Sequence, residues 1–326
     1  MRNLITDVAG VRVGQTQDGA LASGVTALIF DAPATASIAI SGGAPGTRDV
    51  SLLEPGMSVE QVDALVLSGG SAFGLDAMGG VSSWLREQGR GFAVRDALVP
   101  IVPGAILFDL LNGGDKNWGR HAPYRELGYA AAQTAGLDFA LGSHGAGLGA
   151  TTADLKGGIG SASAVTRGGY CVGALVAVNA IGSAMIGKGP HFWAAPFERD
   201  GEFGGFGWPK IMPDLSPAMK GVVPENTTIA IVATDAALSR AQAKRMAVMA
   251  QDGMGRALRP AHAALDGDLV FSAATGRHVT PPDARDLTEI GVAAADCLAR
   301  AIARAIFEAQ PLPFAGALPC WRDLWG

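Results

Sequence analysis

The chain has 326 residues, of which 48% are hydrophobic and 17% are charged, with a formal net charge of −5. This balance predicts a folded protein with a sizeable core, and it argues against a disordered chain and a basic nucleic-acid-binding surface. The three cysteines are widely spaced, the N-terminus lacks a signal-peptide pattern, and no apolar run reaches about 18 residues. We therefore expect a cytoplasmic protein with reduced thiols and no membrane span.

Short runs rich in Ala, Val and Ile predict buried strands, and amphipathic helices separate some of them. Helices are expected at residues 75–89 and 127–135, from a capping box at Ser239 to about residue 256, and after Asp283. Because strands often follow strands, the pattern favours a layered α/β fold over a simple βαβ series. The predicted strands are residues 26–30, 37–40, 64–67, 172–178, 183–186, 227–233 and 269–273.

Residues 187–226 are rich in Gly and Pro and show no hydrophobic period. A segment of this length is unusual inside a compact domain, so we interpret it as a mobile loop that is either functional or disordered. Its aromatic residues indicate that parts of it still pack. The whole chain, 1–326, is interpreted as a single domain.

The end of this segment is the most informative point of the sequence. Asn226 and Thr227 stand where the loop meets a β-branched run, the start of a buried strand. If the bond between them were cut, Thr227 would gain an α-amine with a pKa near about 8, a suitable base for its own hydroxyl. The alternative is an ordinary loop that ends at a strand with two β-favouring threonines.

Three further patterns place polar groups where chemistry is feasible. The glycine-rich turn at residues 68–75, which contains Ser71 and Phe73, follows a strand and opens a helix, so its N–H groups can face a substrate or form a tight turn. Asp266 and Asp268 flank one glycine and either support a site or shape an Asx turn. Asn179 ends a dry strand and either donates to an oxyanion or caps a turn. The five histidines lack metal-ligand spacing, so no metal is expected.

Together and in this order, these stretches resemble the L-aminopeptidase/D-esterase (DmpA-like) peptidase family. The similarity covers nearly the whole chain, at residues 5–14, 42–49, 68–75, 99–103, 145–147, 156–160, 226–236 and 266–268. The resemblance implies a four-layer αββα sandwich, as in N-terminal nucleophile hydrolases. It also implies self-cleavage into residues 1–226 and 227–326.

The resemblance also implies roles for individual residues. Thr227 falls on the nucleophile, Asn179 on the oxyanion donor, and Asp266 and Asp268 on the pair that supports the nucleophile. Asn226 precedes the cut, as in the 6-aminohexanoate (nylon) oligomer hydrolases of the family.

Two positions depart from the pattern that the resemblance implies. An ungapped match puts Asp154 where the nylon-oligomer members have a catalytic lysine. Lys156 lies two residues later and is the candidate catalytic lysine of this chain. Phe108 falls where a tyrosine is expected, and it cannot donate a hydrogen bond. With Ser71 and Phe73, Phe108 is a candidate substrate-binding residue.

The resulting prediction is a self-processing Thr hydrolase that cleaves amide bonds of small amino-terminated substrates through an acyl-enzyme, without a cofactor. One alternative is an amidase or esterase of the same fold acting on an ω-amino-acid oligomer, a D-amino-acid ester or a pantetheine-like amide. Another is a non-cleaving small-molecule-binding protein. We expect a homo-oligomer, a tetramer of cleaved units, with a small amide or peptide as substrate and neither nucleic acid nor membrane as a partner.

Overall fold

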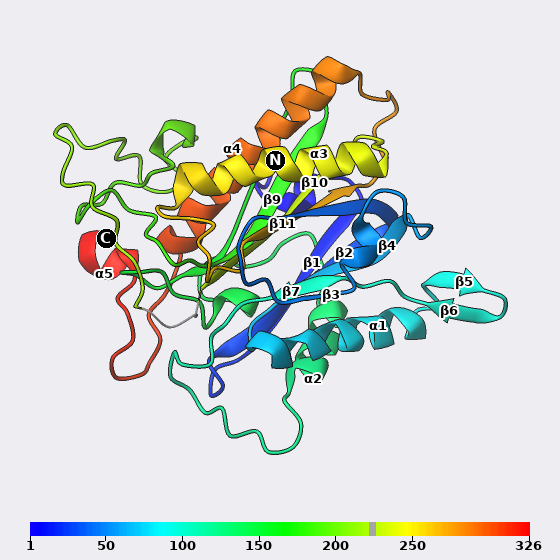
Figure 1. Cartoon of the computed structure of the whole chain (residues 1–326), viewed down its shortest axis with the longest axis horizontal. Helices are drawn as coiled ribbons and strands as arrows, with labels where there is room; N and C mark the ends of the chain where they lie inside the picture. Colours follow the sequence, from blue (N-terminus) through cyan, green and yellow to red (C-terminus); the bar gives the residue numbers. More distant parts are fainter. Residues whose placement is uncertain (222–225) are drawn as a thin grey trace.

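A computed structural model describes residues 1–221 and 226–326 of the chain (Figure 1). A nine-stranded sheet dominates it, in the order β3-β7-β4-β2-β11-β10-β9-β8, with β1 paired to β2. The strands are β1 (Val11–Asp18), β2 (Ser23–Ile40), β3 (Thr47–Arg48), β4 (Gln61–Ser68), β5 (Phe92–Val94), β6 (Ala97–Val99), β7 (Gly104–Ile106), β8 (Gly158–Val165), β9 (Cys171–Asn179), β10 (Thr227–Thr234) and β11 (Leu269–Ala274). The α-helices are α1 (Ala77–Glu87), α2 (Tyr124–Gln133), α3 (Arg240–Ala257), α4 (Ala284–Phe307) and α5 (Trp321–Trp325). Short 3-10 turns are η1 (Ile5–Asp7), η2 (Ser51–Leu53), η3 (Ser71–Asp76), η4 (Gly145–Gly147) and η5 (Ala195–Phe197).

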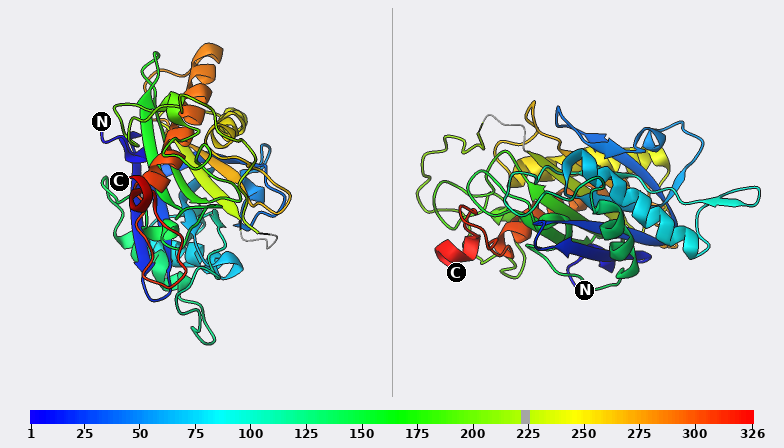
Figure 2. Two further views of the ribbon diagram at one scale, coloured as in Figure 1. Left: turned by 90° about the vertical axis from the view of Figure 1, so that its left-hand side faces the viewer. Right: turned by 90° about the horizontal axis from the view of Figure 1, so that it is seen from below.

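The long strand β2 divides the sheet into two layers. Its first half pairs with β1 and β4, whereas residues 35–40 pair with β11, and the ladder to β4 is irregular between Ile29 and Ala34. Helices α1 and α2 cover the first layer, and α3 and α4 cover the second (Figures 1 and 2). The predicted αββα sandwich is confirmed, with one continuous sheet that bends through β2 to form both inner layers.

Strand β10 lies in the interior and is buried on both faces. Ile229 and Ile231 point into the core between the two sheet layers, which also contains Leu28 and Phe30 of β2. Ala230 points the opposite way, into the core beneath α3 and α4. Alternate residues of a strand face opposite sides, so a continuous apolar run is what a doubly covered strand requires.

The ends of the long helices follow local signals. Ser239 forms a capping box at the start of α3, in which its side chain accepts a hydrogen bond from the backbone N–H of Gln242. Asp283 caps α4 by accepting from two backbone N–H groups. Both predicted helix starts are therefore confirmed. The strand predicted at residues 183–186 is wrong, because Ser183 and Met185 form only isolated bridges there.

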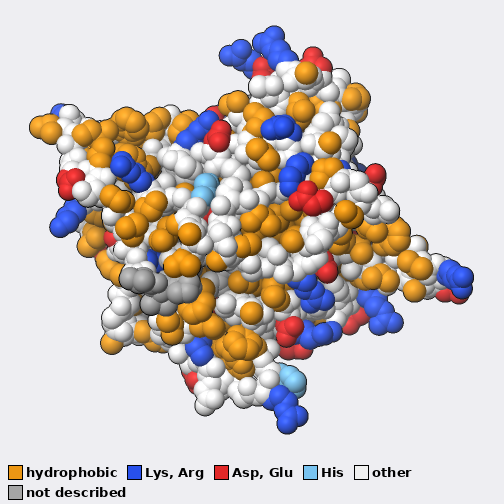
Figure 3. Space-filling model, viewed as in Figure 1, with side chains coloured by type: hydrophobic (Ala, Val, Ile, Leu, Met, Phe, Trp, Pro, Cys, Tyr) orange, Lys and Arg blue, Asp and Glu red, His pale blue; other side chains and the backbone are white. Residues whose placement is uncertain are grey.

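Strands β5 and β6 form a separate hairpin that projects from the body as an arm (Figure 1). All six of its strand residues are exposed, with Phe92 at 48% and Val94 at 53%. The space-filling view shows hydrophobic side chains along this arm and charged side chains at its tip (Figure 3). A pattern search for buried strands does not detect a strand pair of this kind.

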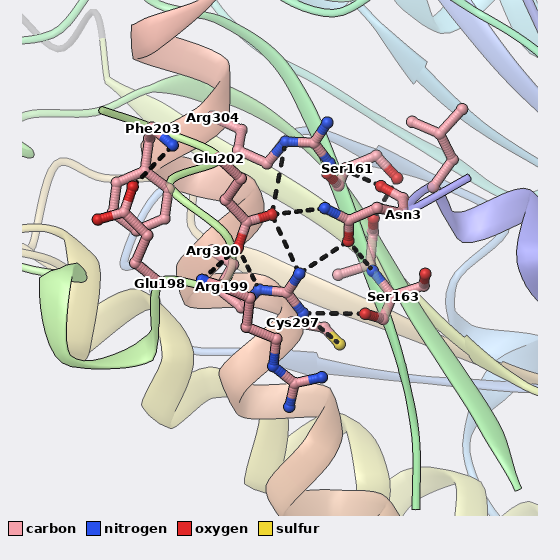
Figure 4. A network of polar contacts seen from close by, with 12 residues as sticks. Asn3, Ser161, Ser163, Glu198, Arg199, Glu202, Phe203, Cys297, Arg300 and Arg304 are labelled. Atoms are coloured by element: carbon pink, nitrogen blue, oxygen red, sulfur yellow. Dashed lines mark hydrogen bonds and ion pairs between the residues drawn. The ribbon is translucent and has the colours of Figure 1, made fainter. Parts of the chain in front are cut away.

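The first half of the long loop, up to about residue 203, packs against the second layer, whereas most of residues 204–221 are exposed. Phe192 and Phe203 are buried in the core beneath α3 and α4. The carboxylate of Glu202 is buried and lies 2.5 Å from the Arg300 guanidinium of α4 (Figure 4). The predicted mobile loop also includes residues 222–225, which lie outside the described residues.

Within the described ranges, no helix combines the length and apolar character that a bilayer span requires.

Candidate active site

The bond between Asn226 and Thr227 lies at the N-terminal end of β10. Thr227 pairs with Asn179 of β9, and Asn226 forms a parallel bridge with Asp266 at the start of β11. All four residues are buried. The sheet therefore brings together four predicted site residues from three neighbouring strand ends.

Two hydrogen bonds converge on the carbonyl oxygen of Asn226. The Thr227 hydroxyl donates to this oxygen through a short bond, and the backbone N–H of Gly267 donates to it at 3.1 Å. The hydroxyl oxygen thus lies beside the carbonyl group of the peptide bond that precedes its own residue. This arrangement can support attack on that carbonyl and stabilise the oxyanion that would result.

Gly267 is a residue that the sequence reasoning overlooked as a site component. A Cβ atom at this position would lie 2.6 Å from Thr227 Oγ1 and 3.0 Å from the carbonyl oxygen of Ala44. The close approach of the backbone to the Thr227 hydroxyl therefore requires glycine. The Asp-Gly-Asp pattern marked the position, but it did not indicate that the glycine N–H faces a carbonyl.

Asp268 is buried and accepts three hydrogen bonds. One oxygen accepts from the backbone N–H of Thr228 at 2.8 Å. The other lies 2.9 Å from both the backbone nitrogen and Nδ1 of His262. Because a carboxylate only accepts hydrogen bonds, Nδ1 of this histidine carries its proton. Searching the histidines only for metal-ligand spacing missed His262.

Asp266 has a different environment from Asp268. Both of its carboxylate oxygens are buried and have no hydrogen-bond partner among residues 1–221 and 226–326. Burial, with a further contribution from the Asp268 carboxylate, raises the pKa of Asp266 to about 8. Burial therefore favours the protonated form of Asp266 in the folded chain.

The Asn179 side chain is fixed at both ends. Its Oδ1 accepts from the backbone N–H of Thr151 at 3.0 Å and from Nζ of Lys220 at 3.1 Å. Its Nδ2 donates to the carbonyl oxygen of Phe108 at 3.0 Å. Lys220 was not predicted, because it lies in a segment without a recognisable pattern.

Lys156 is buried and holds a loop in place. Its Nζ donates to the carbonyl oxygens of Gly147, Ala150 and Gly157 at 2.7–2.9 Å. Burial, and to a lesser extent the charge of Lys220, lowers the pKa of Lys156 to about 7. The loop that Lys156 holds leads to Thr151, which contacts Asn179.

Asp154, which occupies the position of the expected lysine, accepts from the Ser183 hydroxyl at 2.8 Å. Lys156 and Phe108 line a cavity of about 230 Å³, together with residues 312 and 315–318 near the C-terminus.

Thr227 opens onto another cavity, of about 180 Å³. Two of the candidate substrate-binding residues, Ser71 and Phe108, line it. The third, Phe73, is 51% exposed and packs edge-on against Trp118 with ring centroids 5.2 Å apart. Most of the remaining wall is apolar: Ala44, Pro45, Gly46, Ala72, Leu75, Ile106 and Leu265, with Asn226 beside Thr227.

The glycine-rich turn beside this cavity is held by a buried carboxylate that sequence reasoning missed. Asp109 accepts from the backbone N–H of Gly70 at 2.7 Å and from the Ser23 hydroxyl at 2.6 Å. Gly70 adopts a φ of 85°, which only glycine reaches without strain. The turn thus places Ser71 at the cavity wall.

Within the part of the chain that the structure describes, no group of three or more His, Cys, Asp or Glu side chains is arranged to hold a metal ion.

The fold and the comparisons define the class of protein. Residues 3–317 match peptidase family S58. An aminopeptidase of Mycobacterium tuberculosis, described as uncharacterized, is 43% identical over 99% of this chain and 98% of its own length. A 6-aminohexanoate-oligomer endohydrolase of Agromyces is 27% identical over 90% of this chain and 81% of its own length.

A solved structure is also similar in fold. The L-aminopeptidase D-Ala-esterase/amidase of Ochrobactrum anthropi, described as a variant of the Ntn hydrolase fold, matches with a TM-score of 0.71 at 21% identity, covering 98% of this chain and 90% of that one. The protein is thus a hydrolase acting on C–N bonds, of the aminopeptidase type. The chain belongs to peptidase family S58, and the predicted family resemblance is confirmed.

Proposed function

We propose that this protein is a self-processing hydrolase whose nucleophile is Thr227. The observation that carries the proposal is the pair of hydrogen bonds on the Asn226 carbonyl oxygen, one from the Thr227 hydroxyl and one from the Gly267 N–H. The first supports attack by the Thr227 hydroxyl on this carbonyl group, and the second supports the Gly267 N–H as an oxyanion donor.

Self-cleavage proceeds as an N-to-O acyl shift. Thr227 Oγ1 attacks the carbonyl carbon of Asn226, the C–N bond breaks, and the hydroxyl proton passes to the Thr227 nitrogen. Asp266, whose raised pKa favours its protonated form, is a suitable acid beside this bond. Water then hydrolyses the ester, leaving a carboxylate on Asn226, the hydroxyl of Thr227 and a free α-amine. The products are residues 1–226 and 227–326.

Turnover reuses the same groups on a substrate amide. The α-amine of Thr227 accepts the hydroxyl proton, Oγ1 attacks the substrate carbonyl, and the amine returns the proton to the leaving nitrogen. The Gly267 N–H and Asn179 Nδ2 stabilise the oxyanion, and Asp268 fixes Thr228 and so the start of β10. Water hydrolyses the acyl-enzyme.

The cavity beside Thr227 supports a small substrate whose acyl group carries an apolar side chain. Its side-chain lining is mostly apolar, with Ser71, Thr227 and Asn226 as its polar residues. A small amide or peptide with a free amino group fits the aminopeptidase relatives. The same chemistry on an ω-amino-acid oligomer, a D-amino-acid ester or a pantetheine-like amide is the alternative within the fold. A panel of α-, β- and ω-aminoacyl anilides distinguishes these substrates.

Intact mass under denaturing conditions tests the proposal. We expect two fragments that separate between Asn226 and Thr227, from protein that hydrolyses at least one anilide of the panel. Active protein that contains only the full-length 33.1 kDa chain refutes self-processing. An uncut and inactive chain supports the alternative of a small-molecule-binding protein.

We further propose a cytoplasmic homo-oligomer, a tetramer of cleaved units. The free thiols of all three cysteines support the reducing compartment. The exposed apolar arm of β5 and β6 supports self-association.

A further inference from the structure

Lys220 brings a cation to the amide of Asn179 from the segment that precedes the proposed cut. Its Nζ donates to Asn179 Oδ1 at 3.1 Å, and its backbone N–H donates to the carbonyl oxygen of Ile181 at 2.9 Å. Both the main chain and the side chain of Lys220 are thus tied to the end of β9, next to Thr227.

This contact determines which way the Asn179 amide faces. An ammonium group and a backbone N–H can only donate, so the atom that meets both Lys220 and Thr151 must be the amide oxygen. The amide nitrogen consequently faces the other side, where it donates to the carbonyl oxygen of Phe108. Phe108 and Thr227 line the same cavity, so the N–H side of the amide lies beside a residue of that cavity wall.

The charge of Lys220 also acts on the strength of that donor. A charged donor on the oxygen draws electron density through the conjugated amide and leaves the N–H groups more positive. The same cation acts on the carboxyl pair, because it lowers the pKa of Asp266 against the larger effect of burial. Lys220 therefore acts electrostatically on both the proposed oxyanion donor and the carboxyl group at the cut.

We infer that Lys220 is a positioning residue, whose ammonium group orients and polarises the Asn179 amide so that Nδ2 serves as an oxyanion donor. This inference rests on the proposed Thr227 hydrolase function. It assigns to the loop before the cut a role in catalysis as well as in packing.

The test compares Lys220→Met and Lys220→Arg in the full chain. Lys210→Met is the matched control, since Lys210 lies in the same segment with an exposed side chain. The measurements are the rate of precursor conversion by intact mass, kcat and KM on one aminoacyl anilide, and the melting temperature. We expect Lys220→Met to lower processing and kcat about ten- to a hundredfold at nearly constant KM. Lys220→Arg recovers much of the loss, and Lys210→Met matches the wild type.

A double-variant comparison distinguishes positioning of the Asn179 amide by Lys220 from mere anchoring of the loop. If Lys220 acts through the Asn179 amide, adding Lys220→Met to the Asn179→Ser protein does not lower its rate further. If the two residues act independently, the rate loss of the double variant is the product of the two single losses, and the inference is overturned. If Asn179→Ser does not fold, the side-chain amide ¹⁵N signal of Asn179 in the Thr227→Ala protein replaces it. Lys220→Met must shift that signal, and an unmoved signal overturns the inference.

The remaining outcomes distinguish the two proposals. A lowered melting temperature with unchanged kcat identifies Lys220 as a packing anchor and overturns the inference. If Thr227→Ala still matures and turns over, the proposed function itself fails. If Thr227→Ala is inactive while Lys220→Met behaves as the wild type, only the role of Lys220 fails.

Discussion

Thr227 is the residue on which the proposed chemistry depends most directly. Thr227→Ala removes the hydroxyl that serves both self-cleavage and turnover, so we expect an uncut chain without activity. Thr227→Ser keeps the hydroxyl and retains part of both. Intact mass and anilide hydrolysis measure the two effects.

Thr228→Val is the control for Thr227→Ala, because it removes the neighbouring hydroxyl, which has no hydrogen-bond partner among the described residues. Its backbone N–H, which holds Asp268, is kept. If the Thr227→Ala protein is cleaved and the Thr228→Val protein is not, the nucleophile is Thr228 and not Thr227.

Gly267→Ala tests the backbone donor on the scissile carbonyl. The added Cβ would lie 2.6 Å from Thr227 Oγ1, so either the nucleophile or the Gly267 N–H must move. Loss of one oxyanion donor typically costs about 10²–10³ in rate, and we expect processing to slow by that order.

Gly255→Ala in α3 is the control for Gly267→Ala, since a Cβ there meets nothing within 4 Å. It should leave processing unchanged and stabilise the helix by about 0.5–1 kcal/mol. Normal processing of Gly267→Ala would remove Gly267 from the oxyanion site.

The raised pKa of Asp266 predicts a pH dependence of stability in the uncut chain. Between the ordinary pKa of an aspartate, about 3.9, and the folded value of about 8, the folded chain holds a proton that the unfolded chain releases. Stability contributed by this group therefore falls as pH rises through that window. We expect the melting temperature of Thr227→Ala to fall from pH 5 to 8.5, and that of Thr227→Ala/Asp266→Asn to fall less, since an amide does not titrate. Equal slopes by differential scanning fluorimetry contradict the assignment.

The sequence predicts the side chains of the candidate site better than its backbone groups. Thr227, Asn179 and the two aspartates were predicted because their side chains stand at strand ends in a recognisable order. Gly267 and Lys220 were not, because their contribution comes from a backbone N–H and from a loop that returns to the sheet. Such contacts depend on the path of the chain in three dimensions, which residue types alone do not specify.

At the scale of elements, an ion-pair network joins the two fragments of the proposed processed protein. Glu202 belongs to residues 1–226, whereas its partners Arg300 and Arg304 lie on α4 in residues 227–326. Glu202 and Arg300 are almost fully buried, and Asn3 donates to Glu202 as well (Figure 4). This network can keep the fragments together after the cut.

Glu202→Gln removes the counter-charge of the buried Arg300 guanidinium and of the partly buried Arg304 guanidinium. Breaking a buried pair in this way costs about 3–5 kcal/mol, so we expect a lower melting temperature and separation of the fragments at lower denaturant concentration. Glu289→Gln is the control, because Glu289 pairs with an exposed Arg285 one helical turn away. Identical denaturation curves for Glu202→Gln and the wild type would exclude the network as the link between fragments.

Elements with local signals were predicted well, and elements that depend on distant partners were not. The starts of α3 and α4 carry caps within four residues of sequence. Strand β2 was expected as two strands, because Asp31, Ala32 and Pro33 interrupt its apolar pattern and are exposed. The strand nevertheless continues through them, since its two halves pair with different neighbours, β1 and β4 before the bend and β11 after it.

At the scale of the whole molecule, the projecting hairpin of β5 and β6 is the surface where we expect a partner to bind. A two-stranded hairpin is only marginally stable alone in water, and this one exposes Phe92, Val94, Leu98 and Val99. A second copy of the chain that covered these side chains would account for their exposure, in keeping with the symmetric self-association common among enzymes.

We therefore expect light scattering coupled to size exclusion to give a mass several times 33.1 kDa, that of a tetramer. A charge on the arm should dissociate the assembly, so Val94→Asp lowers the mass, while Val279→Asp, at a valine that is 95% exposed in a loop, leaves it unchanged. A wild-type mass of one chain at micromolar concentration contradicts the oligomer. A Val94→Asp protein that keeps the wild-type mass removes the arm from the interface, because a buried aspartate without a counter-charge would not be tolerated there.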